Sequence, residues 1–383
     1  MHSTYRYLLC AVLAGVAAST LVIAPAAAQD KGKKIVVPPP QPQAVQQKQA
    51  PAAPAAPAPL ACGMQGDAEI LCGARSPEDL ELTPDGKAII VSQNVRLGAG
   101  RGAAAGDPVA PFVLFDLAKK TFIPVMLDVK PLTDWGAATC PGPIGTALAA
   151  HGISLAKRKD GKLQFFVVNH GGRESIEMYE LKKISGDWNL IWHGCVPSQK
   201  DFNDVAALPD GGFVATHPTA IQAQGTDLFS GQPTGYVVSW TASKGELELP
   251  GTRFGYPNGV IVSSDGRYAY YNAWTAKEVH KYDLKAGKEA GVVKLAFMPD
   301  NLTWTRKGQI LAAGILATRG DCPVGSGIPC IQSFGVAEID PAKMTSTQIY
   351  DSQGKGALIS GVSVALEAPD GIYIGAFQGD RLV

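Results

Sequence analysis

The sequence predicts an all-β fold, specifically a six-bladed β-propeller with four-stranded antiparallel blades around a central channel. Two observations support this prediction. From residue 62 onward, short runs rich in β-branched and aromatic residues, such as QFFVVNH, YVVSW and IYIGAF, alternate with clusters of Gly, Pro, Asp and Asn. This is the pattern of many short antiparallel strands. The second observation is a hairpin signal that recurs six times between such runs.

The recurrent signal is a tight turn between two strand-like runs. Five copies carry Asp-Gly, as in ELTPDGKAIIV and IVSSDGRYAYY, and a sixth, TWTRKGQILAA, has Lys-Gly in the same place. Asp-Gly is favoured because such hairpin turns require positive φ. The turns fall at residues 85, 160, 210, 265, 307 and 370, a spacing that suits six four-stranded units with loops of variable length. A β-sandwich is the alternative, but six hairpins of one type favour the propeller.

Two segments ahead of the propeller are expected to lie outside the fold. Residues 1–28 contain Arg6, an apolar stretch from Leu8 to Ile23 and an Ala-Ala-Ala pattern before Gln, which together predict a cleaved signal peptide and a secreted or periplasmic protein. An uncleaved membrane anchor is the alternative, since the apolar stretch is nearly long enough to span a bilayer; after cleavage we expect no membrane span. Residues 29–61 are rich in Pro, Ala and Gln and predict a disordered tether, which leaves 62–383 as the propeller domain.

The balance of charges excludes one class of partner. Lys plus Arg and Asp plus Glu are both 34, so the formal net charge is zero. A chain with this balance has no electrostatic footprint for nucleic acid or for an anionic membrane. We therefore expect no nucleic-acid partner.

Six cysteines remain after removal of the signal peptide, namely Cys62, Cys72, Cys140, Cys195, Cys322 and Cys330. An even number in an exported chain suggests disulfides, although six cysteines allow 15 pairings. The segment CPVGSGIPC favours a local bridge from Cys322 to Cys330, and pairs 62–72 and 140–195 then follow by elimination. A metal cluster is the alternative, which the absence of a CxxC motif or interleaved His disfavours.

Polar residues recur at one phase of the repeat. Counting back seven residues from the turns leads to Glu78, Asn203, Asn258, Asp300 and Ser363; from Asp160 the nearest polar residue is His151, nine residues back. The innermost strands of a propeller run parallel along the channel, so these residues should converge at its far mouth, roughly 20 Å from the turns. The alternative is that each satisfies local backbone donors at a strand start. Five occurrences at one phase favour convergence.

The converging set matches the ligand preference of calcium. Glu78, Asn203, Asn258, Asp300 and the adjacent Asn301, hereafter the oxygen ring, offer two carboxylates and three amide carbonyls. Hard oxygen ligands of this kind suit Ca²⁺, and two negative charges balance one ion. Asp79 and Asp204 each follow a ring residue, and we expect them to support the ring or to hold a second Ca²⁺.

Short strings along the chain give a family resemblance. They are SPEDLEL (76–82), HGIS (151–154), VVNH (167–170), NDV (203–205), PNGV (257–260), PDN (299–301) and the terminal GVSVA…IYIGAF. In this order the sequence resembles the paraoxonase/arylesterase family of calcium-dependent six-bladed propellers, which is related to the gluconolactonase-like propellers. The resemblance spans residues 76 to 377.

The resemblance also implies roles for individual residues. The oxygen ring corresponds to the ligands of a catalytic Ca²⁺, and Asp79, Asp204 and the backbone carbonyl of Ile153 correspond to those of a structural Ca²⁺. His151 and His170 correspond to a proposed general base and its partner. An imidazole titrates near neutral pH and suits that task.

The function implied is that of a secreted hydrolase of aryl esters, lactones or both, acting on a small-molecule substrate. Two alternatives stay open, a gluconolactonase-like sugar lactonase and a non-enzymatic, calcium-stabilised ligand-binding propeller. The sequence has no Gly-x-Ser-x-Gly motif, which disfavours a serine esterase. Tyr256, Trp274 and Phe229 are candidate pocket walls, and His217 is expected near the same mouth of the channel.

Overall fold

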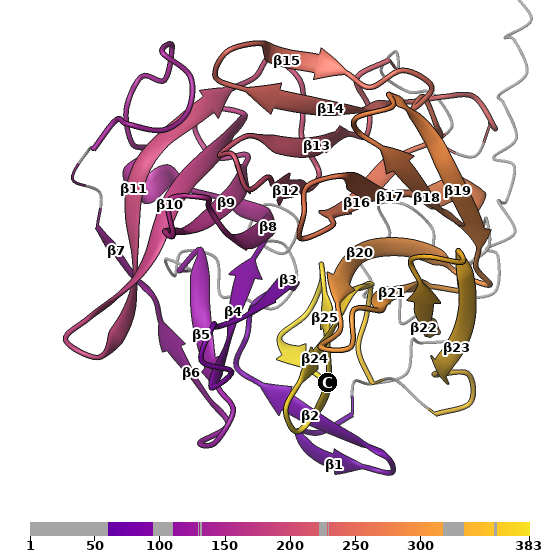
Figure 1. Ribbon diagram of the computed structural model, residues 1–383. Coiled ribbons are helices and arrows are strands. Elements are labelled where there is room, and N and C mark those ends of the chain that lie inside the picture. Colours follow the sequence, from indigo (N-terminus) through magenta and orange to yellow (C-terminus); the bar gives the residue numbers. More distant parts are fainter. Residues whose placement is uncertain are drawn as a thin grey trace, which may run out of the picture. The chain divides into compact units, whose positions relative to one another are not determined.

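The chain forms a six-bladed β-propeller, which confirms the predicted fold (Figure 1). The computed structural model describes residues 60–94, 110–128, 130, 132–221, 228, 230–316, 333–355 and 358–383. The expected signal peptide, all but the last two residues of the expected tether, and Cys322, Cys330 and Phe229 lie outside these ranges. Within them, no helix is long and apolar enough to cross a membrane.

The first five blades are four-stranded antiparallel sheets, ordered from the channel outward as they occur in the sequence (Figure 1). Blade 1 contains β3 (Pro77–Leu82), β4 (Ala88–Gln93), β5 (Phe112–Asp116) and β6 (Thr121–Pro124). Blade 2 contains β8 (Ala150–Lys157), β9 (Leu163–Asn169), β10 (Ser175–Ile184) and β11 (Asp187–Pro197), with β7 (Met126–Asp128) parallel to β11. Blade 3 contains β12 (Val205–Ala207), β13 (Phe213–His217), β14 (Tyr236–Thr241) and β15 (Gly245–Glu248). Blade 4 contains β16 (Pro257–Val262), β17 (Tyr268–Ala273), β18 (Glu278–Asp283) and β19 (Lys288–Lys294), and blade 5 contains β20 (Met298–Trp304), β21 (Ile310–Ile315), β22 (Phe334–Asp340) and β23 (Thr345–Asp351).

Blade 6 joins the two ends of the propeller. Its inner strands are β24 (Val362–Ala368) and β25 (Gly371–Ala376), and its outer part is a sheet of β26 (Arg381–Leu382), β2 (Ala68–Cys72) and β1 (Gly63–Gln65). The amide of Val383 donates to the carbonyl of Ile374 at 3.0 Å and the reverse bond is 2.6 Å, which connects the two sheets. The ring of blades is therefore closed by backbone pairing between segments more than 300 positions apart.

Five of the six predicted turns have the expected backbone. Their glycines lie at positive φ, between 67° and 91°, namely Gly86, Gly161, Gly211, Gly266 and Gly308. The sixth turn differs, because Gly371 is not at positive φ and already pairs with Ala368 as the first residue of β25. A two-residue loop at 369–370 closes that hairpin.

The blades are held together by apolar side chains between neighbouring sheets. Between blades 2 and 3, Phe166 and Phe213 are fully buried and meet edge to face at 6.5 Å, and Phe213 stacks on Trp240 at 5.4 Å. Large aromatic side chains bury much apolar area and dominate core energetics. These contacts fix each blade against the next and hold the inner strands in place around the channel.

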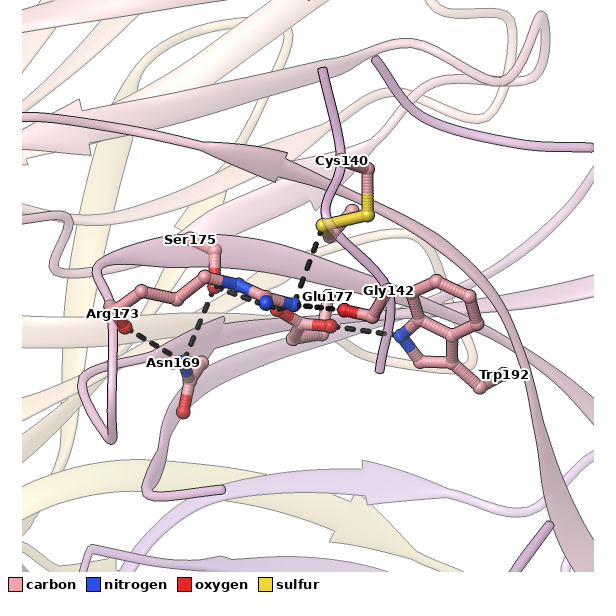
Figure 2. Close-up of a disulfide and its surroundings, with 8 residues drawn as sticks. Cys140, Gly142, Asn169, Arg173, Ser175, Glu177 and Trp192 are labelled. Carbon is pink, nitrogen blue, oxygen red and sulfur yellow. Dashed lines mark hydrogen bonds and ion pairs between the residues drawn. A yellow bond between two sulfur atoms is a disulfide. The ribbon is translucent and has the colours of Figure 1, made fainter. Parts of the chain in front are cut away.

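The described residues contain two disulfides, one in blade 6 and one beside blade 2. The structure joins Cys62 to Cys72, and Cys140 to Cys195 of β11 (Figure 2), which is the pairing that the sequence favoured. The second bridge closes a loop of 55 positions and ties the segment before β8 to the outer strand of blade 2.

Replacing both Cys140 and Cys195 with Ala is expected to lower the free energy of unfolding by about 4 kcal/mol, since closing a longer loop removes more entropy from the unfolded chain. The Cys62→Ala/Cys72→Ala pair, with a separation of only 10 positions, serves as the matched control and should cost about 3 kcal/mol. Guanidinium unfolding curves of both double variants measure the two values. Equal stability of the Cys140/Cys195 variant and the wild type would contradict the prediction.

Candidate active site

Five of the polar residues counted back from the turns, namely Glu78, His151, Asn258, Asp300 and Ser363, lie at interruptions in the innermost strands. The strand register shifts between Pro77 and Asp79 in β3, Ala150 and Ile153 in β8, Pro257 and Val260 in β16, Pro299 and Leu302 in β20, and Val362 and Val364 in β24. A β-bulge re-aims side chains and places two residues opposite one. This explains why consecutive residues such as Asp300 and Asn301 can both reach neighbouring blades, which a regular strand would not allow.

Two glycines in the recognised strings allow the inner strands to approach closely. A Cβ atom at Gly152 of HGIS would lie 2.2 Å from Oδ1 of Asp204, and one at Gly259 of PNGV would lie 2.2 Å from the backbone oxygen of Asp300. Any larger residue would push neighbouring blades apart at the site. These glycines therefore serve the packing of the site rather than a turn.

The three asparagines of the oxygen ring are oriented by bonds to their amide groups. Asn301 Nδ2 donates to Glu78 Oε1 at 2.8 Å and to the Glu78 backbone oxygen at 3.2 Å. The Asn258 side chain is hydrogen-bonded to the Asp300 carboxyl group, and that of Asn203 to the Tyr256 hydroxyl. The side-chain nitrogen of Asn301 thus donates to Glu78. Because an ionised carboxyl group can only accept, the side-chain nitrogen of Asn258 likewise donates to Asp300.

The oxygens of the same side chains have no partner. Oδ1 of Asn203, Asn258 and Asn301 and Oε2 of Glu78 are buried without a hydrogen bond among the described residues. Buried polar atoms are nearly always satisfied, so each exception requires an explanation. Four such oxygens, contributed by four different blades, fit a hard cation that accepts oxygen ligands.

Burial also raises the pKa of the carboxyl groups at the site. The pKa of Glu78 is raised to about 7 by loss of hydration, which its bond from Asn301 partly offsets. The pKa values of Asp79, Asp204 and Asp300 are raised well above the usual range by burial and then by neighbouring carboxylates. Ionising all four groups requires a compensating positive charge. Among the described residues no three His, Cys, Asp or Glu side chains form a metal-binding group.

The second predicted ion site lies deeper in the channel. Asp79 Oδ2 accepts from the Ile153 amide at 2.8 Å, and Asp204 Oδ2 accepts from the Val260 amide at 2.7 Å. Asp79, Ile153 and Asp204 line one cavity of about 360 Å³ whose walls come from the inner strands of all six blades. Glu81 lines the same cavity, and burial raises its pKa to about 8. The structure thus brings together all three residues implied for this site.

The predicted histidine pair lies beside the oxygen ring. His151, on β8, is 8% exposed, and its Nδ1 is 2.8 Å from Nε2 of His170, which directly follows β9. The other nitrogen of His151, Nε2, is 3.5 Å from Glu78 Oε1. A titratable nitrogen is therefore held next to the cluster of unpartnered oxygens.

The remaining predicted pocket residues divide between the site and the core. Tyr256 and Trp274 have ring centroids 5.6 Å apart, and Tyr256 is held to the oxygen ring through Asn203. His217 ends β13, and its Nδ1 lies 2.7 Å from the backbone oxygen of Asp201, two residues before Asn203. Its side chain is fully buried and stacks on Phe202 at 4.3 Å, so it does not line a pocket. Its position after a turn predicted where it lies along the strand, but not that its side chain is buried inside the blade.

Two polar residues at the site had no role assigned from the sequence. Asn272 of β17 donates from Nδ2 to the backbone oxygen of Asp300, and its Oδ1 is another buried oxygen without a hydrogen bond. Ser363, which the repeat count reached but to which no role was given, donates to the Glu78 backbone oxygen at 2.6 Å. Asn272 lies on β17, the second strand of blade 4. The oxygen ring was predicted from residues that precede the turns, so Asn272 was not among them.

Comparison with known proteins agrees with this geometry. Residues 140–319 match the model of the SMP-30/gluconolactonase/LRE-like region. Serum paraoxonase/arylesterase 1 of Homo sapiens is 26% identical over 218 residues, which cover 55% of this chain and 56% of that protein. Serum paraoxonase/lactonase 3 of Homo sapiens is 27% identical over 242 residues, covering 59% and 65%. The chain therefore spans between 56% and 65% of the length of these relatives.

A solved luciferin-regenerating enzyme aligns with 82% of this chain and 91% of its own at 12% identity and a TM-score of 0.46, a similarity too low to carry a functional argument. The match to the family model and the two curated relatives agree with the strings read from the sequence. They also agree with the six blades of the structure. The resemblance of this chain to the paraoxonase/arylesterase family, and to the related gluconolactonase-like propellers, is thereby confirmed.

Proposed function

We propose that the protein is an exported, calcium-dependent hydrolase of small esters or lactones. One observation carries the proposal, namely the four buried oxygens of Glu78, Asn203, Asn258 and Asn301 that have no partner although their side chains are otherwise held in place. Similarity to an arylesterase and to a lactonase supports the class of reaction. Two disulfides support export, because such bonds persist in oxidising compartments.

The oxygen ring would hold the catalytic ion, and Asp79, Asp204 and the Ile153 carbonyl the structural ion. A Ca²⁺ ion bound by the oxygen ring supplies Lewis-acid polarisation and charge compensation for a developing oxyanion. Hydrogen bonds from neighbouring side chains and backbone amides orient these ligands before any ion binds, as residues around metal ligands generally do.

The histidine pair supplies the proton transfer. Nε2 of His151 removes a proton from the attacking water as the water oxygen bonds to the carbonyl carbon and forms a tetrahedral intermediate. The acyl–oxygen bond of the ester or lactone then breaks, and the departing oxygen takes the proton back from His151. His170 holds the ring of His151 in place through Nδ1 at 2.8 Å. Burial of His151 restricts the water that reaches this nitrogen.

The match to the SMP-30/gluconolactonase/LRE-like region favours a second substrate class, sugar lactones. The two possibilities share the ring and differ in substrate, so one substrate series separates them. Purified protein at saturating Ca²⁺ is tested with phenyl acetate, aliphatic lactones of increasing ring size and gluconolactone. Turnover of phenyl acetate or aliphatic lactones supports the proposal, turnover of gluconolactone alone supports the sugar lactonase, and no turnover with Ca²⁺ bound supports a non-enzymatic binding propeller.

A further inference from the structure

The turn between β9 and β10 carries a carboxylate that extends the histidine pair. Oε2 of Glu174 lies 2.6 Å from Nδ1 of His170, and Nε2 of His170 lies 2.8 Å from Nδ1 of His151. The far nitrogen of His151 is 3.5 Å from Glu78 Oε1. Glu174, His170 and His151 therefore form a continuous chain of hydrogen bonds that ends at the oxygen ring.

The carboxylate of Glu174, at one end of this chain, determines which ring nitrogens donate and which accept. A carboxylate can only accept, so Nδ1 of His170 carries the hydrogen and its Nε2, in the neutral ring, is an acceptor. Nδ1 of His151 must then donate, which leaves the lone pair of His151 on Nε2, the nitrogen that faces Glu78. We propose that Glu174 is a positioning residue that fixes this tautomer and so makes Nε2 of His151 the base; this inference rests on the proposed function.

The turn that carries Glu174 is held firmly. Oδ1 of Asn169 accepts from the amides of Ala149 and Gly171, and its Nδ2 donates to the Arg173 backbone oxygen at 2.8 Å. The sequence permits the tight path, since Gly172 is at positive φ and a Cβ at Gly171 would lie 1.7 Å from the Ala147 oxygen. The backbone on both sides of Glu174 is thus fixed against β8 and its preceding segment.

Arg173, next to Glu174, anchors the turn to a buried ion pair beside the disulfide (Figure 2). Its guanidinium donates to Glu177 Oε1 at 2.7 Å, to the Gly142 oxygen at 2.7 Å and to Cys195 Sγ at 3.4 Å. Glu177 is fully buried, and its remaining oxygen accepts from Trp192 Nε1 at 2.8 Å. A fully paired buried charge is costly to disturb, so Glu174 is presented from a rigid support.

Other histidines of the protein show how a purely structural contact looks. Nδ1 of His193 is 2.6 Å from Asp134 and Nδ1 of His280 is 2.7 Å from Glu289, much as in His170. Their Nε2 atoms, however, lie 3.2 Å from Glu180 and 3.4 Å from a carboxylate oxygen of Glu278, so carboxylates face both nitrogens. The Glu174 chain differs because it passes through a second imidazole, and because the carboxylate oxygen 3.5 Å from its last nitrogen, Oε1 of Glu78, belongs to the oxygen ring and already accepts from Asn301.

The test uses the full exported chain, saturated with Ca²⁺, and three variants. Glu174→Gln is expected to lower kcat by about 10- to 100-fold, the range found for residues that orient ligands at metal sites, with KM changed less than about twofold. Glu174→Asp, which keeps the charge, should restore much of the rate. Glu289→Gln removes the same type of bond from His280 and should leave kcat unchanged.

A second measurement reports on the histidines without turnover. The sequence has only six histidines, so the ¹⁵N shifts of histidine-labelled protein identify which ring nitrogen of His151 and His170 carries hydrogen. Glu174→Gln is expected to shift both residues away from the Nδ1–H tautomer, since the Gln amide can donate to His170, whereas Glu289→Gln should not affect them. Unchanged tautomers in Glu174→Gln, or an unchanged kcat, would overturn the inference.

The two proposals fail in different ways. If the wild type hydrolyses no ester or lactone, the proposed function fails, and with it the base role of His151, whatever the tautomers. If the wild type is active and Glu174→Gln matches it in kcat, the proposed function stands and the positioning role of Glu174 is wrong. A lower kcat with unchanged tautomers and a lower melting temperature would assign Glu174 to stability alone.

Discussion

Asn258→Ala is expected to lower kcat/KM by roughly 10³-fold even at saturating Ca²⁺. The substitution removes one of the unpartnered buried oxygens and also the hydrogen bond to the Asp300 carboxyl group. Residues that only support metal ligands already change activity by 10- to 100-fold when altered, and loss of a direct ligand should exceed that range. Initial rates on phenyl acetate or a lactone, together with metal content by mass spectrometry, measure the effect.

The matched control for this variant is Asn189→Ala. Asn189, on β11, donates only to the Asp187 backbone oxygen at 2.9 Å on the surface of blade 2, so its loss should leave rate and ion content unchanged. Circular dichroism checks that both variants are folded. An Asn258→Ala protein that retains wild-type activity would remove the oxygen ring from the proposed mechanism.

Removal of calcium is expected to make stability strongly pH-dependent. The pKa of Glu78 is raised from 4.5 to about 7 and that of Glu81 from 4.5 to about 8, and those of Asp79, Asp204 and Asp300 are raised well above their usual values. A carboxyl group with a raised folded-state pKa binds its proton more tightly in the folded protein. The ion-free protein should therefore lose stability as pH rises from about 4 to about 8.

The size of this loss follows from the shifts. One pKa unit corresponds to about 1.4 kcal/mol, so the rise in the pKa of Glu78 from 4.5 to about 7 corresponds to on the order of 3 kcal/mol, and that of Glu81 from 4.5 to about 8 to on the order of 5 kcal/mol. Bound Ca²⁺ requires ionised carboxylates and should abolish or reverse the slope. Unfolding by guanidinium at pH 5.5 and pH 8, in EDTA and in excess Ca²⁺, gives the four values needed.

The Glu81→Gln variant isolates the part of the pH-dependent stability that comes from Glu81. Glu81 lines the channel cavity but belongs to neither proposed set of ligands, so this variant should keep calcium binding and lose only its own part of the slope. If the ion-free wild type is as stable at pH 8 as at pH 5.5, the carboxyl groups are not neutralised in the way the structure indicates.

The parts of the fold that depend on local sequence were the most predictable. Five Asp-Gly turns and one Lys-Gly turn indicated the number of blades, and in five of the six the glycine adopts the positive φ that these two adjacent residues favour. The phase of Glu78, Asn203 and Asn258 relative to these turns then predicted their convergence. The Cys62–Cys72 and Cys140–Cys195 disulfides were predicted by elimination, after Cys322 had been assigned to Cys330, and the structure forms both.

What the sequence did not reveal depends on pairing between distant segments. The β-bulges at Glu78 and at Asp300–Asn301 are visible only in the register between two strands. Blade 6 takes strands from both ends of the propeller, and no local pattern signals that exchange. Glu174 was missed because its importance comes from the folded turn that aims it at His170, and the burial of His217 was not foreseen because position along a strand does not give burial.

Closure of blade 6 has a consequence for how the protein folds. Glu78 of the first blade bonds to Asn301, 223 positions away, and accepts from Ser363, 285 positions away. Contacts of such sequence separation form late and slow folding, because the loop entropy must be overcome before they contribute. The residues proposed to bind calcium would therefore meet only late in folding, so that acquisition of the ion would report that the circle of blades has closed and would select complete molecules over partially folded ones.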